Sequence, residues 1–164
     1  MAAGDLNEDG RPDLAVAVTG YGTSRVSVLS NVTAPGATTA SFAARQDFAL
    51  DATHYSHCIA VDDLDGDGRP DLGVLGKSAY DSTSMASVLL NTTTPGSATV
   101  SFQPRQESVV GESSGGSQSL TTGDVNADGR QDLVLSLRRS DDNLGMILLN
   151  TSVLLDDDEA IGTI

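Results

Sequence analysis

Short apolar stretches alternate with turn-forming residues along most of the chain. Runs rich in Val, Leu and Ile are separated by Gly, Ser, Thr and Asn, which is typical of β-strands joined by turns. No segment shows a convincing helical pattern. The predicted strands are residues 14–18, 25–31, 41–48, 58–63, 72–76, 86–91, 101–110, 118–124, 133–137 and 145–150. The pattern therefore predicts an all-β fold.

These strands belong to an internal repeat of roughly 60 residues. An acidic segment occurs three times, at residues 5–13, 63–71 and 124–132. Each copy is followed by an apolar run that ends in VLSN, VLLN or ILLN. After the first two of these runs, the chain continues with similar segments that contain PG, then SF, then RQ. A unit of this size buries too little surface to be stable alone, so the units should stack.

Four strands fit each complete unit, and such a unit is typical of a β-propeller blade. We therefore expect a β-propeller segment of about three four-stranded antiparallel blades, the first and last incomplete. The first blade is expected to lack its innermost strand and the third its outer strand. The predicted boundaries are residues 1–56, 57–117 and 118–152 for the blades, and 153–164 for a linker or tail.

The acidic segments read DLNEDGRPD, DLDGDGRPD and DVNADGRQD. Like charges at this spacing repel one another unless a cation lies between them. Calcium takes six to eight oxygen ligands, which side chains at positions 1, 3, 5 and 9 and a carbonyl at position 7 can supply, while glycine at position 6 permits the turn. Magnesium suits such a loop less well, and zinc prefers His or Cys.

Three Ca²⁺ sites are therefore predicted, each with the same ligand positions. The candidate ligands are Asp5, Asn7, Asp9, the carbonyl of Arg11 and Asp13; Asp63, Asp65, Asp67, the carbonyl of Arg69 and Asp71; and Asp124, Asn126, Asp128, the carbonyl of Arg130 and Asp132.

The helix-loop-helix calcium hand is the rival interpretation of this pattern. It requires a bidentate Glu at position 12 and flanking helices. Position 12 is occupied by Val16, Val74 and Leu135, and a strand-like run begins directly after position 9. The sequence therefore favours a loop between two strands.

The charge of the chain limits its possible partners. It has 23 acidic and 9 basic residues and a net charge of −14, which argues against nucleic acid or an anionic membrane surface as partner. No apolar run approaches the length of a membrane span, so membrane insertion is not expected. The start MAAGDLNEDG lacks the apolar core of a secretion signal, so any such signal is expected upstream.

The acidic loop followed by DL and a strand resembles FG-GAP or VCBS-type repeats over residues 1 to about 152. Such repeats form calcium-loop blades in integrin α-subunit propellers and in bacterial surface proteins. The resemblance implies that each acidic loop joins the first and second strands of a blade. The Phe-Gly and Gly-Ala-Pro signatures are not clearly present, which favours the bacterial surface-protein branch. The resemblance implies an extracellular, secreted or cell-surface module for adhesion or for binding an unknown protein or glycan ligand. Further blades of a parent chain, or self-association, are also expected.

Two alternatives to a binding module remain. Some propellers of this kind belong to polysaccharide lyases or hydrolases, and others could serve as structural spacers. We expect no enzyme activity from this chain: the GESSG string at residues 111–115 lacks the following helix of a nucleophile elbow, and His54, His57 and Cys58 are interpreted as structural or surface residues. Asn31, Asn91 and Asn150 fit the glycosylation sequon but are interpreted as turn residues.

Overall fold

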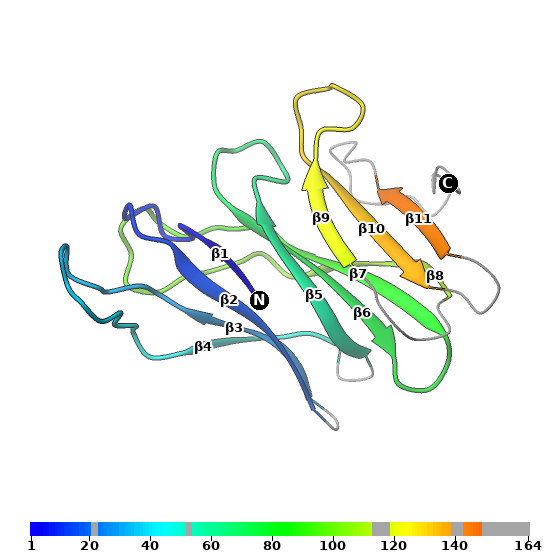
Figure 1. The fold of residues 1–164 in the computed structure, drawn as a ribbon, viewed down its shortest axis with the longest axis horizontal. Helices are drawn as coiled ribbons and strands as arrows, with labels where there is room; N and C mark the ends of the chain where they lie inside the picture. Colours follow the sequence, from blue (N-terminus) through cyan, green and yellow to red (C-terminus); the bar gives the residue numbers. More distant parts are fainter. Residues whose placement is uncertain (21–22, 52–53, 113–118, 139–142, 149–164) are drawn as a thin grey trace.

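Three antiparallel β-sheets lie one after another along the chain in the computed structural model (Figure 1). The structure describes residues 1–20, 23–51, 54–112, 119–138 and 143–148. Within these ranges all of the regular secondary-structure elements are β-strands, which confirms the all-β prediction. Within the same ranges, no helix is present that could cross a bilayer.

Each sheet is a simple meander in which consecutive strands are hydrogen-bonded neighbours. The first sheet contains β1 (Ala2–Gly4), β2 (Asp13–Gly20), β3 (Thr23–Leu29) and β4 (Gln46–Ala49). The second contains β5 (His54–Asp62), β6 (Asp71–Ser78), β7 (Thr83–Leu89) and β8 (Gln106–Glu112). The third contains β9 (Ser119–Gly123), β10 (Asp132–Arg138) and β11 (Asn143–Leu148). This arrangement fits a partial β-propeller-like fold, while the predicted unit boundaries stay predictions.

The first sheet has an innermost strand, which the sequence analysis did not expect. Ala2 and Gly4 of β1 pair with Ala15 and Asp13 of β2. The sequence AAG carries no β-branched or aromatic residue, so its backbone pairing with β2, rather than its side chains, makes it a strand. The fourth strand also begins later than predicted, at Gln46, because residues 31–43 form a hairpin of their own with a bridge between Asn31 and Phe42.

The sheets pack face to face, and the two interfaces form the apolar core. Strand β5 of the second sheet contacts β1, β2 and β3 on one side and β9 on the other. The first interface buries Leu6, Ala15, Val26, Val28 and Leu50 against Ile59, Leu72, Val74, Leu89 and Val100. The second buries Leu64, Leu75, Ala86, Val88 and Val110 against Leu133, Leu135 and Leu137. Each core cluster is therefore shared by two neighbouring units.

Two glycines allow the sheets to approach closely. A Cβ atom at Gly73 would lie 2.8 Å from Leu133 Cδ2, and one at Gly4 would lie 2.5 Å from Val61 Cγ1. Both contacts are between different sheets, so a larger residue would require the Leu133 or Val61 side chain, or the sheet that carries it, to shift. The three acidic loops connect β1 to β2, β5 to β6 and β9 to β10, on the upper side of Figure 1. The stack therefore presents all three loops along one side of the molecule.

Candidate metal centre

Each acidic loop is closed by its first carboxylate. The side chain of Asp5 accepts the backbone N–H groups of Asp9 and Gly10, at 2.9 and 2.8 Å. The second and third loops repeat these two bonds: Asp63 accepts from Asp67 and Gly68, at 3.1 and 2.8 Å, and Asp124 from Asp128 and Gly129, at 3.0 and 2.9 Å. Carboxylate oxygens carry about four lone-pair sites, so these bonds leave sites for a cation.

The glycine at position 6 allows the turn that the sequence analysis expected by adopting a left-handed conformation. Its φ is +85° at Gly10, +88° at Gly68 and +87° at Gly129. Position 4 is left-handed as well, with φ of +54° at Glu8, +78° at Gly66 and +61° at Ala127. Only the second loop has glycine there, so the other two loops hold a side chain in a region that disfavours it.

The carboxylate at position 9 is buried and joins three segments. Asp13 and Asp71 are fully buried, and each accepts two backbone N–H groups. Asp71 accepts from Leu64 within its loop, at 2.9 Å, and from Asn91 after β7, at 2.7 Å. Asp13 makes the equivalent bonds at 3.1 and 2.7 Å, and Asp132 accepts from Val125 at 3.0 Å. In the first and second loops, the carboxylate at position 9 therefore connects the loop to a residue just after the third strand of the same sheet.

The arginine at position 7 makes contacts that the sequence analysis did not anticipate. The Arg11 guanidinium pairs with the Asp9 carboxylate at 2.6 Å, and its Nε donates to the carbonyl of Asn31 at 2.8 Å. Arg69 repeats both contacts, with Asp67 and with the carbonyl of Asn91 at 3.0 Å. The arginine therefore partly neutralises the position-5 carboxylate. An arginine occupies position 7 in all three acidic segments, and this recurrence was the sequence signal that could have indicated its role.

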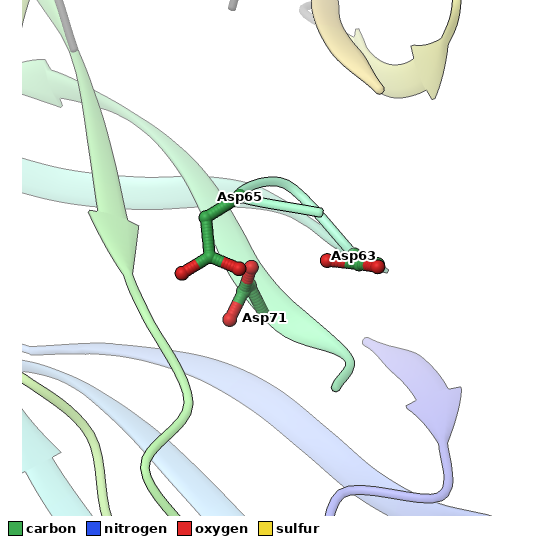
Figure 2. Close-up of side chains that lie close together, drawn as sticks. All are labelled: Asp63, Asp65 and Asp71. Carbon is green, nitrogen blue, oxygen red and sulfur yellow. The ribbon is translucent and has the colours of Figure 1, made fainter. Parts of the chain in front are cut away.

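The second loop brings three carboxylates together. One ligand oxygen from each of Asp63, Asp65 and Asp71 lies within 4.8 Å of the others. Figure 2 shows the carboxylates of Asp65 and Asp71 pointing toward each other, from the loop and from the start of β6. Burial raises the pKa of Asp71 to about 6 and also raises the pKa of Asp65, and neighbouring aspartates add to both shifts. A cation at this position would relieve both the burial cost and the repulsion.

The first and third loops differ because Asn replaces Asp at position 3. Nδ2 of Asn7 donates to Asp9 Oδ2, at 3.2 Å, and Nδ2 of Asn126 donates to Asp128 Oδ2, at 3.0 Å. The second bond lowers the pKa of Asp128. Oδ1 of Asn126 accepts the Asp128 N–H at 3.1 Å, whereas Oδ1 of Asn7 is buried without a hydrogen-bond partner. A buried carbonyl oxygen without a donor is costly, and a cation in the first loop would satisfy it.

The second acidic loop has a group of carboxylates that could hold a metal ion. In the second loop Asp63, Asp65 and Asp71 come together, whereas the predicted ligand Asp67 is not part of this group and pairs with Arg69. Among the described residues, no equally tight acidic group occurs in the first or third loop. The complete ligand sets, including the Arg11, Arg69 and Arg130 carbonyls, stay predictions. The candidate ligand atoms are all oxygen atoms, which calcium prefers.

The two described sequon asparagines act as turn residues. Oδ1 of Asn31 accepts the N–H of Thr33 at 2.9 Å, and its Nδ2 donates to the carbonyl of Pro12 at 3.0 Å. Asn91 makes the equivalent bonds with Thr93 and Pro70. The turn interpretation therefore holds for both residues, whereas Asn150 and Ser113 lie outside the described residues, as do the side chains of His54 and His57.

The chain was also compared with known proteins. Residues 5–74 match the family model of the FG-GAP-like repeat, which supports the predicted FG-GAP-type repeat over that part of the chain. The matched region covers the first acidic loop, strands β2 to β5, the second acidic loop and the start of β6. Neither the comparison with curated proteins nor that with solved structures found a match.

Proposed function

We propose that this chain is a calcium-binding β-propeller repeat module that recognises a protein or glycan ligand outside the cell. The observation that carries the calcium proposal is the convergence of Asp63, Asp65 and Asp71 within 4.8 Å in a loop whose hydrogen bonds recur in two other loops. Three ions would bring the net charge from −14 to −8, since each adds two positive charges.

The proposed extracellular location rests on the FG-GAP-like repeat over residues 5–74, and the expected calcium affinity is compatible with it. Extracellular calcium modules bind the ion with dissociation constants of about 10⁻⁴ to 10⁻³ M, where calcium is plentiful. An ion at about 100 times its dissociation constant stabilises the fold by about 2.7 kcal/mol per site, provided that the unfolded chain does not bind it. The proposed role is binding and not catalysis, with neither nucleic acid nor a membrane as partner, consistent with the strongly acidic chain.

Calcium titration of the chelator-treated chain by calorimetry tests the metal proposal. We expect three sites, of which the second loop binds tightest because Asp65 adds a carboxylate where the other loops have Asn. Asp65→Asn should weaken that site, and Asn126→Asp should strengthen the third loop, because Asn126 is exposed and can accept the extra charge.

Glu107→Gln is the matched control, since Glu107 is acidic but pairs with Arg105 outside the loops. It should leave all three affinities unchanged. Binding of no calcium, or an Asp65→Asn variant that binds like the parent, would contradict the metal proposal.

The ligand proposal needs a separate experiment. The calcium-loaded chain is applied to immobilised acidic glycans, neutral glycans and extracellular matrix proteins, with and without a chelator. Calcium-dependent retention on one class supports ligand recognition. Retention on none of them would support the structural-spacer alternative.

A further inference from the structure

We propose that the hairpin of residues 91–103 in the second unit belongs to the metal site of the first acidic loop. Its backbone fixes the side-chain amide of Asn7 so that Oδ1 is the oxygen left for the ion, and it makes asparagine rather than aspartate the fitting ligand at position 3. The proposal rests on the metal binding proposed above and extends it to positioning residues that lie outside the loop.

The hairpin crosses from the second unit to the first. Residues 91–103 leave β7 and extend to the first sheet (Figure 1). Gly96 N–H donates to the carbonyl of Asn7 at 2.6 Å, and Asn91 Nδ2 donates to the carbonyl of Leu6 at 2.9 Å. Leu6 and Asn7 are only 1% and 3% exposed. The second unit therefore holds positions 2 and 3 of the first loop in a buried, hydrogen-bonded contact.

The orientation of the Asn7 amide follows from its two acceptors. Nδ2 donates to the carbonyl of Ser97 at 2.8 Å and to Asp9 Oδ2 at 3.2 Å. The reversed amide would place an oxygen against both of these acceptors. Oδ1 therefore takes the remaining position, where it is buried and has no hydrogen-bond partner among the described residues. Such an oxygen is costly, and a metal ion would satisfy it.

The hairpin is also held by contacts away from the first loop. The Gln46 side chain of β4 binds the backbone of Val100 on both sides: Oε1 accepts the N–H at 2.8 Å, and Nε2 donates to the carbonyl at 3.3 Å. At the base of the hairpin, Asn91 N–H donates to Asp71 Oδ1 at 2.7 Å. These contacts fix the hairpin without an ion, so it can orient a ligand as the outer-shell partners of metal sites do.

This geometry determines which residue suits position 3. An aspartate in place of Asn7 would turn a carboxylate oxygen toward the Ser97 carbonyl and the Asp9 carboxylate, and it could donate to neither. The added charge would be buried without a partner on that side. A count of charges alone predicts the opposite, because Asp65 occupies position 3 of the second loop. The first loop should therefore lose affinity for the ion although it gains a carboxylate.

Calcium titration of the full chain, followed by the backbone amide NMR signals of Gly10, Gly68 and Gly129, reads each loop separately. Asn7→Asp should raise the dissociation constant reported by Gly10 about tenfold and leave the other two unchanged. Asn126→Asp is the matched control, because it makes the same change at an exposed residue of the third loop, and it should not weaken the site reported by Gly129. A first site that binds as tightly or more tightly in Asn7→Asp would overturn the proposal.

Changes in the hairpin alone provide a second test. Gly96→Ala places a Cβ at a φ of +74° and disturbs the turn that binds Asn7, whereas Gly36→Ala makes the same change at +77° in the hairpin of the first unit. Gly96→Ala should raise the dissociation constant reported by Gly10 about threefold or more, and Gly36→Ala should not change it. Gln46→Ala, which releases Val100, should act like Gly96→Ala. Equal effects of the two glycine variants, or no effect of Gly96→Ala and Gln46→Ala, would overturn the proposal.

The same titrations separate this proposal from the proposed function. If none of the three glycine signals responds to calcium, metal binding is wrong, and the role of the hairpin is wrong with it. If Gly10 responds equally in the parent chain, Asn7→Asp and the hairpin variants, metal binding stands and the role of the hairpin alone is wrong. Circular dichroism checks that each variant folds, and if Asn7→Asp does not fold, the matched pair Gly96→Ala and Gly36→Ala decides.

Discussion

Asp71 Oδ1 accepts the backbone N–H of Asn91 at 2.7 Å, which joins the last residue of the second acidic loop to the end of β7. Its other oxygen accepts the N–H of Leu64 at 2.9 Å. Both bonds are buried, so the geometry of this loop and the pairing of its strands depend on each other. The first loop repeats the relationship through Asp13 and Asn31.

Asp71→Asn tests this relationship. The amide keeps the shape of the side chain but faces two N–H donors with only one oxygen, so one buried donor loses its partner. We expect the free energy of unfolding without calcium to fall by about 1–3 kcal/mol, measured by urea denaturation. Asp65→Asn is the control, because Asn occupies this position in the other two loops, and it should change this free energy much less. Equal losses in the two variants would contradict the assigned role of Asp71.

The left-handed residue at position 4 gives a second prediction. Ala127→Gly should raise the free energy of unfolding by about 0.5–1 kcal/mol, because glycine adopts a positive φ without the steric cost of Cβ. Gly66→Ala should lower it by a similar amount. Ala44→Gly, at an exposed residue without positive φ, should not stabilise the chain. Urea denaturation of the three variants measures these changes, and a stabilising Gly66→Ala would contradict the prediction.

The buried carboxylates predict the pH dependence of the calcium-free chain. The pKa of Asp71 is about 6 in the folded chain and about 3.9 in an unfolded one, so the folded state binds more protons between these values. Its contribution to stability is present below about pH 4 and is lost as the pH rises through about 6. The raised pKa values of Asp13 and Asp65 act in the same direction.

In chelator, the urea midpoint should therefore be higher at about pH 5 than at about pH 7. Part of this difference should disappear in Asp71→Asn, which separates the effect of Asp71 from the general repulsion among acidic residues. Calcium should reduce the difference in the parent chain, because protons compete with the ion for the same carboxylates. A calcium-free midpoint that rises over this pH interval would contradict the assignment.

The sequence predicted the local features of the fold because they repeat in register. The spacing of carboxylates around Gly10, Gly68 and Gly129 indicated the loops and the turn at position 6, and the apolar runs indicated most strands. The three-residue strand β1 was missed, since Ala2–Gly4 has no strand-forming side chains and depends on its pairing with β2.

Contacts between units could not be predicted from the repeat. Asn7 and Asn126 occupy the same position in equivalent loops, yet Asn7 is buried and Asn126 is exposed. The difference comes from Ser97, which lies 90 residues from Asn7 and reaches it only because the second unit packs on the first. Repetition indicates what each unit contains, whereas the stacking of units decides which of its surfaces are covered.

The most direct test of the central claim is the melting temperature of the chain in calcium and in chelator, measured by differential scanning calorimetry at neutral pH. If calcium holds the acidic loops in their folded arrangement, chelation should lower the melting temperature by several degrees or more, and Asp67→Ala should show a smaller calcium-dependent shift than the parent chain. An unchanged melting temperature after calcium removal would show that the loops fold without the ion and would contradict the account.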